Sequence, residues 1–258
     1  MNYIDAIILG IIQGLTEFLP VSSSGHLVLA EELLKVKMPG VTFEVLIHIG
    51  TLVSVLIYFR ARIWRLVQAL FNREMIGERR MLLFLVIGTI PAGFFGLLFK
   101  DLLEKTFSNP VETSVELIIT GLILLVPKLF RAGNKGLSLG STIIMGFGQA
   151  VAILPGISRS GTTIVSGMLA GVKPSEAAEF SFLLSIPAIG GASLLEAKHL
   201  LELQSALVLP YMVATLVSFL FGLLSVYVVL ATVKRGKFDY FAYYCFAIGA
   251  FGLYHFLS

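Results

Sequence analysis

Long apolar stretches separated by short polar segments dominate the chain. Six of them carry few charges and approach the length of about 20 residues that an α-helix needs to cross the hydrocarbon core of a bilayer. These stretches predict membrane-spanning helices at residues 43–59, 81–99, 113–130, 177–195, 206–233 and 238–257. The pattern therefore predicts an all-α polytopic membrane protein with six transmembrane helices.

Two further apolar stretches are interrupted by polar residues. The first, residues 6–30, contains Gln13, Glu17, Pro20 and a serine-rich run that ends at His26. A plain helix spanning lipid would leave such polar groups unsatisfied, because the hydrocarbon core offers no hydrogen-bond partners. We therefore expect this stretch to form a re-entrant helical hairpin rather than a further span.

The second interrupted stretch, residues 137–172, carries a single charge, Arg159. Pro155 and Gly156 break its apolar run shortly before the arginine. Such a break in a membrane helix is often only a kink, but two breaks, each followed by hydroxyl side chains, favour a second re-entrant hairpin. A lone guanidinium in hydrocarbon costs about 2.5 to 3.5 kcal/mol, so Arg159 must face protein, water or an anion.

The composition agrees with a membrane protein. Of the 258 residues, 57% are hydrophobic and only 14% are charged, and the mean hydropathy is +0.91. These values lie outside the range of soluble globular domains. With a formal net charge of only +3, no nucleic-acid partner is expected. The one cysteine, Cys245, excludes a disulfide framework and a cysteine metal site, and no cleavable signal peptide is expected because the first apolar run lacks a basic start.

The distribution of Lys and Arg predicts the orientation of the spans. If both interrupted stretches enter and return on the same side, thirteen basic residues lie in inward loops and five lie outside. If residues 137–172 instead crossed the membrane, the counts would be ten and eight. Because cytoplasmic loops are enriched in basic residues, the first arrangement is favoured, with both termini outside.

The two interrupted stretches also resemble each other in sequence. A shift of 136 residues without a gap superposes five identities, with apolar residues matched between them. The first copy holds Gly10, Gln13, Ser22, Ser24 and Gly25, which fall on Gly146, Gln149, Ser158, Ser160 and Gly161. Three spans separate the copies, an odd number, so the second would be inverted. We expect one integral membrane domain, residues 1–258, built as an inverted-topology repeat of about 1–130 and 131–258, with the broken helices meeting near the midplane.

The first interrupted stretch carries candidate chemistry. Gln13 and Glu17 are four residues apart and share a helix face, and Ser22 and His26 have the same spacing after the Pro20 break. Amide and carboxylate oxygens suit a hard divalent cation, and a serine nucleophile needs a base within hydrogen-bond reach. His26 taken alone could be a satisfied interior histidine, and Glu17 could be a buried acid or the proton relay of a transporter.

The second interrupted stretch offers an anion site. A broken helix presents backbone N–H groups at its new N-terminus, and Arg159 adds a fork of donors that matches phosphate. Hydroxyl side chains surround the arginine, at Ser158, Ser160, Thr162 and Thr163. A phosphate held between the two broken helices is the arrangement that these residues favour.

Other polar and small residues have weaker interpretations. Glu44 and Glu179 open two spans at nearly corresponding positions and would either ring the site or lie at the interface. His48 and His255 are assigned to packing or to the interface, and the aromatic residues of 240–244 to an interfacial belt. The arginine-rich loop of residues 60–80 is interpreted as a topology signal. Close helix approach is expected at glycine pairs, Gly93 with Gly96 and Gly190 with Gly191.

Two motifs carry a resemblance to a known family. The run QGLTEFLPVSSSGH, from Gln13 to His26, resembles the (E/Q)xxxE segment and serine-rich loop of the bacterial undecaprenyl pyrophosphate phosphatases, also called bacitracin-resistance proteins. The run PGISRSGTT, from Pro155 to Thr163, resembles their PGxSRSxxT motif. Both motifs are long and ordered, and the layout of spans agrees over the whole chain.

The resemblance implies an integral membrane phosphatase that removes the terminal phosphate of undecaprenyl pyrophosphate, recycles the lipid carrier of cell-wall synthesis and confers bacitracin resistance. It implies a divalent cation, Mg²⁺ or Ca²⁺, at Glu17 and Gln13, where Gln13 replaces a glutamate that many members have. Catalytic roles fall on His26, Ser23 or its neighbour Ser22, Glu17 and Arg159. Substrate binding falls on Arg159, Ser158, Ser160, Gly161, Thr163 and Gln13.

The resemblance also implies a location. The protein would lie in the bacterial plasma (inner) membrane, with the active site facing the extracytoplasmic side and the isoprenyl tail in lipid, and a homodimer is left open. A transporter or flippase for a phosphorylated lipid is the main alternative, because inverted repeats with broken helices are the usual transporter architecture. A scaffold without a site is disfavoured by the paired motifs. The SGH element of type 2 phosphatidic acid phosphatases is present at Ser24 to His26, but their SRxxxxxHxxxD motif is absent.

Overall fold

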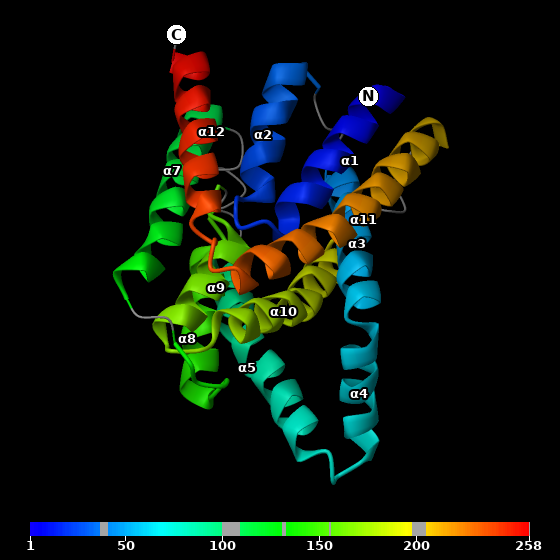
Figure 1. The fold of residues 1–258 in the computed structure, drawn as a ribbon. Helices are drawn as coiled ribbons and strands as arrows, with labels where there is room; N and C mark the ends of the chain where they lie inside the picture. The colour runs from blue at the N-terminus through cyan, green and yellow to red at the C-terminus, as the bar shows by residue number, and fades with distance from the viewer. Residues whose placement is uncertain (37–40, 100–108, 131–132, 155, 198–204, 258) are drawn as a thin grey trace.

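The computed structural model describes residues 1–36, 41–99, 109–130, 133–154, 156–197 and 205–257, and is all-helical over these ranges (Figure 1). Pro155, one of the two residues expected to break the second stretch, lies outside the described residues. The α-helices are α1 (Tyr3–Phe18), α2 (Ser23–Leu34), α3 (Val41–Tyr58), α4 (Arg60–Phe71), α5 (Ile76–Leu98), α7 (Pro110–Leu125), α8 (Leu139–Val151), α9 (Arg159–Leu169), α10 (Pro174–Leu195), α11 (Ser205–Lys234) and α12 (Tyr240–Leu257). A short 3-10 helix, η1 (Val126–Leu129), continues α7.

Six candidate membrane spans are present in the described part of the chain, as the sequence predicts. They are α3, α5, α7 with η1, α10, α11 and α12, each long and apolar enough to cross a bilayer. The segment 60–80, interpreted as a loop, is instead largely helical, since it contains α4 and the start of α5. The protein is therefore a multi-pass membrane protein, with an additional helix between its first two spans.

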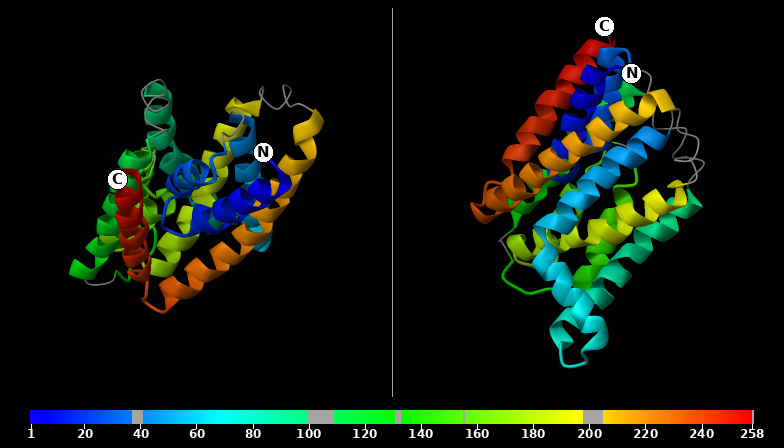
Figure 2. Two further views of the ribbon diagram at one scale, coloured as in Figure 1. Left: turned by 90° about the horizontal axis from the view of Figure 1, so that it is seen from above. Right: turned by 90° about the vertical axis from the view of Figure 1, so that its right-hand side faces the viewer.

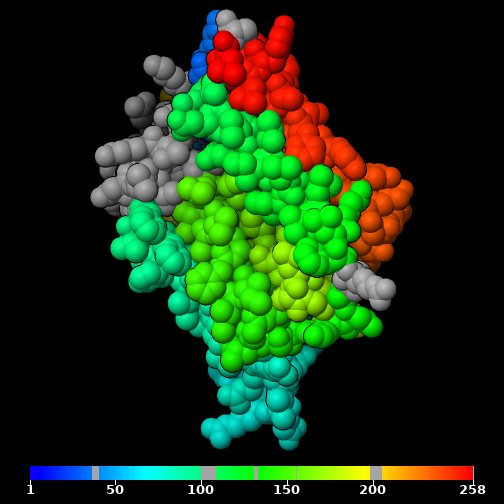
Figure 3. Space-filling model, turned by 90° about the vertical axis from the view of Figure 1, so that its left-hand side faces the viewer, coloured from blue at the N-terminus to red at the C-terminus, as the bar shows by residue number. Residues whose placement is uncertain are grey.

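The outer faces of the spans are apolar. On α5, the residues Leu83, Val86, Ile90, Phe94 and Leu97 recur every three or four positions and are all exposed. Such a stripe would be unfavourable in water, and in a bilayer it faces lipid tails. Figure 3 shows one outer face, where α7 and α12 lie side by side and the α4–α5 connection projects at one end.

Small residues and hydroxyls hold the spans together. The Ser54 and Ser218 hydroxyls donate across the α3–α11 interface to the carbonyls of Phe219 and Ile47, each at 2.7 Å. A Cβ added at Gly14 would lie 2.6 Å from the Ser218 carbonyl oxygen, so only glycine permits this approach of α1 to α11. These contacts replace the hydrophobic effect, which cannot drive association between helices already surrounded by lipid.

The glycine pairs expected to permit close helix approach do not do so. Among the described residues, a Cβ added at Gly93 or Gly191 would meet no atom within 4 Å, and the nearest atoms to one at Gly96 or Gly190 lie 3.9 Å away. Close approaches occur instead at Gly10, Gly14 and Gly50, where an added Cβ would lie 2.4 to 2.6 Å from carbonyl oxygens of α11. The spacing of small residues alone does not show which face of a helix is covered.

Two helix pairs, α1 with α2 and α8 with α9, meet at their breaks in the middle of the bundle (Figures 1 and 2). The Gly156 amide, between α8 and α9, donates to Ser24 Oγ of α2 at 3.4 Å. In return, Ser160 Oγ of α9 donates to the carbonyl of Leu19, between α1 and α2, at 3.2 Å. Both chain termini lie at one end of the molecule, and the connection between α4 and α5 lies at the other.

The chain segments that lead into α8 and out of α9 lie together. The Lys135 amide donates to the Gly171 carbonyl, and the Lys173 amide donates to the Lys135 carbonyl, both at 3.0 Å. Gly171 adopts a φ of +85°, a left-handed conformation that glycine tolerates without a steric penalty. The two ends of residues 137–172 therefore lie next to each other.

Candidate active site

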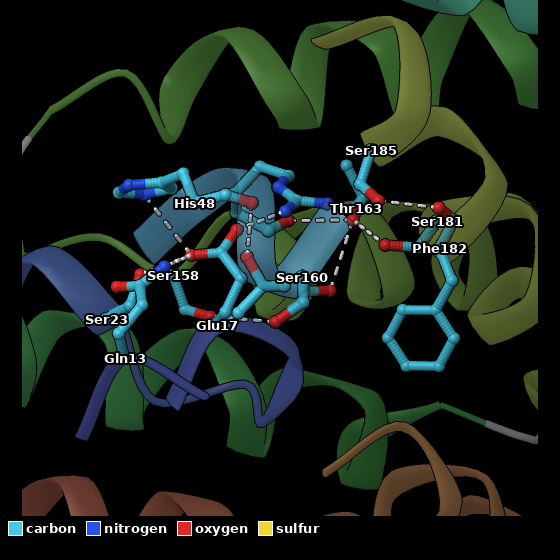
Figure 4. Close-up of polar contacts among 12 residues, drawn as sticks. Gln13, Glu17, Ser23, His48, Ser158, Ser160, Thr163, Ser181, Phe182 and Ser185 are labelled. Carbon is cyan, nitrogen blue, oxygen red and sulfur yellow. Dashed lines mark hydrogen bonds and ion pairs between the residues drawn. The ribbon is translucent and has the colours of Figure 1, made fainter. Parts of the chain in front are cut away.

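The Glu17 carboxylate is the centre of the polar cluster in Figure 4. It lies in the last turn of α1, and its side chain is only 6% exposed. Gln13 Nε2, one turn earlier on the same helix face, donates to Glu17 Oε2 at 3.0 Å. Ser23 Oγ, at the first position of α2, donates to the same oxygen at 2.6 Å. Because α1 stops at Phe18 and α2 starts at Ser23, the break itself brings the hydroxyl onto the carboxylate.

Arg159 compensates the buried charge of Glu17. It is the first residue of α9, and its Nη2 donates to Glu17 Oε1 at 2.5 Å. An unpaired buried ion is strongly destabilising, so each of these side chains requires the other in this environment. The second amino group of the guanidinium, Nη1, is buried and has no hydrogen-bond partner in the part of the chain that the structure describes. Arg159 therefore retains a donor for an anionic ligand.

His26 is held by a different set of partners. Its Nδ1 lies 2.7 Å from the Ser22 carbonyl oxygen, and since a carbonyl only accepts, Nδ1 carries the hydrogen. Ser22 caps α2 with a φ of +67°, an uncommon conformation for a non-glycine residue that turns its carbonyl toward the imidazole. In the neutral ring Nε2 is an acceptor, and the Tyr244 hydroxyl of α12 donates to it at 3.0 Å. The two rings also stack with an angle of 4° between their planes.

The hydroxyls around Arg159 form the scaffold of the break. Ser158 Oγ accepts from the Gly161 amide at 3.1 Å and so caps α9, and Ser160 Oγ donates to the α1–α2 connection. Thr163 Oγ1 lies 2.5 Å from the Ser181 hydroxyl of α10 and donates to the Arg159 carbonyl at 2.7 Å. All three side chains are buried and bonded within the protein, so in this conformation they fix the start of α9 rather than point at a ligand.

The start of α9 is further fixed by α7. Thr120 Oγ1 donates to the Gly156 carbonyl at 3.0 Å and accepts from the Ser158 amide at 3.1 Å. Gly156 has a φ of +83°, and a Cβ there would lie 2.5 Å from Cβ of Glu116. A glycine is therefore required at this position both for conformation and for space.

The structure brings the predicted residues together in two groups. Gln13, Glu17, Ser23 and Arg159 form one hydrogen-bonded cluster. Ser22 and His26 form the second, next to Ser23 in the chain. Within the described residues, no hydrogen bond joins His26 to Ser23 or to Arg159. The sequence places Ser22 and His26 at helical spacing, and the His26 ring does contact Ser22, but through the Ser22 carbonyl. The hydroxyl that contacts the Glu17 carboxylate is that of Ser23.

Two residues that contact these groups, His48 and Tyr244, were not predicted from the sequence as site residues. His48 on α3, assigned to packing or the interface, has its Nε2 3.5 Å from Glu17 Oε2. An ionisable side chain within a membrane span is itself a signal of function, and that rule would have identified it. Tyr244, assigned to an interfacial belt, reaches His26, and no local pattern distinguishes it from its aromatic neighbours. Glu179, in contrast, pairs with Arg62 of α4 at 3.3 Å.

The cluster has donor atoms for a divalent cation. Gln13 Oε1 is buried and has no hydrogen-bond partner among the described residues, and it belongs to the amide that contacts Glu17. No group of three or more His, Cys, Asp and Glu residues suited to a metal occurs within the ranges that the structure describes. The unpaired amide oxygen and the Glu17 carboxylate fit a cation such as Mg²⁺, which one or two protein oxygens commonly hold together with substrate phosphates.

Comparison with known proteins explains why these residues occur together. Residues 6–251 match the family model described as bacitracin resistance protein BacA. The chain belongs to this family. It is 40% identical over 256 residues to an undecaprenyl-diphosphatase of Carboxydothermus hydrogenoformans, covering 96% of this chain and 95% of that protein.

Other relatives carry the same description. An undecaprenyl-diphosphatase of Syntrophotalea carbinolica is 41% identical over 255 residues, with 96% of this chain and 97% of that protein covered. One from Methanobrevibacter smithii is 40% identical over 266 residues, with 96% of each chain covered. Because archaeal as well as bacterial proteins are among the relatives, family membership does not fix a bacterial source.

Proposed function

We propose that this protein is an undecaprenyl-diphosphatase that hydrolyses undecaprenyl diphosphate to undecaprenyl phosphate and inorganic phosphate. The observation that carries the proposal is the contact of one buried carboxylate, Glu17, with both a serine hydroxyl and a guanidinium that come from two separate helix breaks. The family and the names of the full-length relatives support the same reaction. This reaction would recycle the lipid carrier and give resistance to bacitracin.

The diphosphate lies between the two breaks. Arg159 Nη1 donates to a phosphate oxygen, since it is a buried donor beside Glu17 that has no hydrogen-bond partner among the described residues. The N-terminus of α9 contributes the positive end of its helix dipole, and Ser158, Ser160, Gly161 and Thr163 hold that end in place. The isoprenyl tail extends between the spans into lipid.

Ser23 and Glu17 carry out the phosphoryl transfer. Ser23 Oγ attacks the terminal phosphorus, its proton passes to Glu17 Oε2, and the bond to the bridging oxygen breaks, releasing the lipid monophosphate. Water then attacks the phosphoserine and the bond between Ser23 Oγ and phosphorus breaks. Glu17 returns its proton to Ser23 Oγ, and inorganic phosphate leaves with the oxygen and the protons of the water. In the direct variant of this reaction, a water molecule takes the place of the serine oxygen. His26, whose Nε2 is an acceptor, handles a proton of the attacking water or the leaving group once Tyr244 gives way.

A divalent cation, Mg²⁺ or Ca²⁺, is part of the proposal. Glu17 and Gln13 would hold it through Oε2 and the unpaired Oε1. The chemistry that such an ion supplies is neutralisation of the charge on the diphosphate. Arg159 remains beside Glu17 and limits the negative charge that the site presents in the absence of substrate.

The membrane architecture is proposed as two re-entrant hairpins, α1–α2 and α8–α9, in an inverted repeat of residues 1–130 and 131–258 within one domain. Hydrogen bonds that recur with the offset of 136 residues support the repeat. Ser22 Oγ lies 3.2 Å from Ser24 Oγ and Ser158 Oγ lies 3.2 Å from Ser160 Oγ, and each first serine accepts from the amide three residues on. The adjacent ends of residues 137–172 support entry and return on one side.

The catalytic opening is proposed on the extracytoplasmic side of the plasma membrane, where the first hairpin would enter, and the distribution of basic residues supports this side. Cysteines placed singly at Gly77 and at Asn109, on opposite sides in this topology, test the orientation by labelling from outside intact cells. Cys245 is buried, so it contributes little background. Labelling at Asn109 alone supports the proposed orientation, and labelling at Gly77 alone reverses it.

The activity is tested by phosphate release. Purified protein given undecaprenyl diphosphate and a divalent cation should release one inorganic phosphate per lipid, and Glu17→Gln and Arg159→Ala should abolish release. Chelation should remove activity, and Mg²⁺ or Ca²⁺ should restore it. A folded protein that binds the lipid without releasing phosphate would contradict the proposal.

A flippase is the second candidate, favoured by the repeated helix breaks. Reconstituted liposomes with labelled lipid distinguish the two. Lipid movement by the Glu17→Gln variant at the wild-type rate, with no hydrolysis, would assign transport to this fold. If the Glu17→Gln variant loses both lipid movement and hydrolysis, the phosphatase would be the one function supported.

A further inference from the structure

His48 is the one described histidine that contacts the Glu17 carboxylate. It lies on α3, a helix that contributes no residue to either motif, and its side chain is 29% exposed. Figure 4 shows its ring on the side of Glu17 nearest Gln13 and Ser23. No step of the proposed hydrolysis uses the His48 ring.

The hydrogen bonding of the ring decides what His48 can offer. Nδ1 lies 2.7 Å from the Glu44 carbonyl oxygen, one turn earlier on α3. A carbonyl accepts only, so Nδ1 carries a hydrogen, and in the neutral ring Nε2 presents a lone pair. That lone pair points toward Glu17 Oε2, which is itself an acceptor.

The distance between the two atoms is that of neighbouring metal ligands. His48 Nε2 and Glu17 Oε2 are 3.5 Å apart, beyond the usual length of an N–H···O hydrogen bond. With metal–ligand bonds of about 2.1 to 2.4 Å, adjacent donors of one coordination sphere lie about 3.0 to 3.5 Å from each other. A cation can therefore bind both atoms with little movement of α1 or α3.

A third donor atom lies one turn before Glu17 on α1. Gln13 is fully buried, its Oε1 has no hydrogen-bond partner among the described residues, and its Nε2 contacts Glu17 Oε2. An unpaired buried acceptor costs free energy unless a ligand satisfies it. The three side chains come from two helices, α1 and α3, that are held together by their shared contact with α11.

We propose that His48 supplies a nitrogen ligand to the divalent cation, alongside Glu17 Oε2 and Gln13 Oε1. The inference deepens the proposed function and rests on its cation. It explains how a site with Gln13 in place of a second carboxylate still binds a divalent ion. An imidazole also changes selectivity, because it suits Mn²⁺ and later transition metals better than it suits Ca²⁺.

The test uses Mn²⁺ as the probe and detects its ligands directly. The full-length protein, without a polyhistidine tag, is titrated with Mn²⁺ in detergent, and the bound ion is examined by pulsed electron paramagnetic resonance for coupling to the ¹⁴N of an imidazole. Wild type and His255→Gln, a control on the distant end of α12, should both show this coupling. The variant His48→Gln, which replaces nitrogen with an amide oxygen, should bind Mn²⁺ without it.

Affinity gives a second measurement. His48→Ala should weaken Mn²⁺ binding about tenfold or more, since even indirect partners of metal ligands contribute that much. The ratio of turnover with Mn²⁺ to turnover with Ca²⁺ should fall in His48→Gln. Melting temperatures of the variants, measured without metal, verify that each is folded.

Each result bears on one proposal or on both. Mn²⁺ bound without ¹⁴N coupling in wild type, or with coupling that persists in His48→Gln, would show that His48 only forms an ion pair with Glu17, and the phosphatase would stand. No bound Mn²⁺ in an active, chelator-insensitive wild type would overturn the cation and this ligand together. A failure of phosphate release alone would overturn the proposed function and leave the metal site in place.

Discussion

Ser23 and Arg159 each open a helix directly after a break, 136 residues apart, and both bind the same carboxylate. Ser23 Oγ donates to Glu17 Oε2 at 2.6 Å, and Arg159 Nη2 donates to Oε1 at 2.5 Å. Under the offset of the repeat, the two residues occupy equivalent positions. In the proposed repeat, equivalent positions of the two halves would thus supply the proposed nucleophile, Ser23, and the proposed anion-binding group, Arg159.

Replacing Glu17 by Gln should abolish most of the activity. The amide cannot accept the Ser23 proton, and it leaves Arg159 without its counter-charge. General-base and electrostatic contributions together predict a fall in kcat of about a thousandfold. Initial rates of phosphate release measure it, with Glu179→Gln as the matched control, because Glu179 pairs with Arg62 instead. Near-wild-type turnover in Glu17→Gln would remove the carboxylate from the mechanism.

The Arg159→Lys variant keeps the charge but removes the fork of donors. Lysine can still pair with Glu17, so the fold should survive, while the donor that Nη1 offers to phosphate is lost. We expect kcat/KM to fall by about a hundredfold or more. Arg60→Lys is the control, because Arg60 is exposed and its Nη1 donates to the Ile57 carbonyl near the end of α3, away from Glu17. Equal losses in both variants would show a general effect of the substitution.

The serines of the first break should separate into different roles. Ser23→Ala should remove turnover, because its hydroxyl contacts Glu17. Ser22→Ala should instead destabilise the protein by about 1 kcal/mol, since Ser22 caps α2. Ser24→Ala should reduce activity least, as its hydroxyl accepts a long bond of 3.4 Å from Gly156. Phosphate release and thermal denaturation in detergent are measured side by side. A fully active Ser23→Ala would indicate direct attack by water.

The hydroxyl of Tyr244 is expected to hold the His26 ring in place until Nε2 exchanges this hydrogen bond for a proton of the reaction. Tyr244→Phe preserves the stacked ring and removes only the bond to Nε2, so kcat should fall about threefold to tenfold with little change in KM. The neighbouring Tyr243, which contacts Lys128 instead, provides the control variant Tyr243→Phe. A KM effect of equal size in both would assign Tyr244 to the membrane interface.

Substitutions at glycine test the packing. Gly14→Ala would drive a Cβ against the Ser218 carbonyl of α11, so overpacking should destabilise the protein by about 1 to 3 kcal/mol. Gly191→Ala meets no described atom within 4 Å and should be neutral or stabilising by up to about 1 kcal/mol, because alanine is the better helix former. Thermal denaturation in detergent gives both values. A stable Gly14→Ala would mean that α1 and α11 can separate.

The sequence by itself determined the spans, both helix breaks and the motifs at them. Each is a local property: the length of an apolar run sets a span, and a cluster of polar residues with Pro or Gly interrupts it. The pairing of Gln13 with Glu17 was also predictable, because residues four apart on a helix are neighbours.

Only the tertiary structure decided the partners that come from different helices. The contacts of Glu17 with Arg159 and His48, and of His26 with Tyr244, join residues 31 to 218 positions apart. They depend on the rotation and crossing of α3, α9 and α12. The packing of small residues and hydroxyls between helices sets this arrangement, and no periodicity along the chain encodes it. For the same reason, the sequence did not show that the Ser23 hydroxyl would bond to the Glu17 carboxylate on the preceding helix.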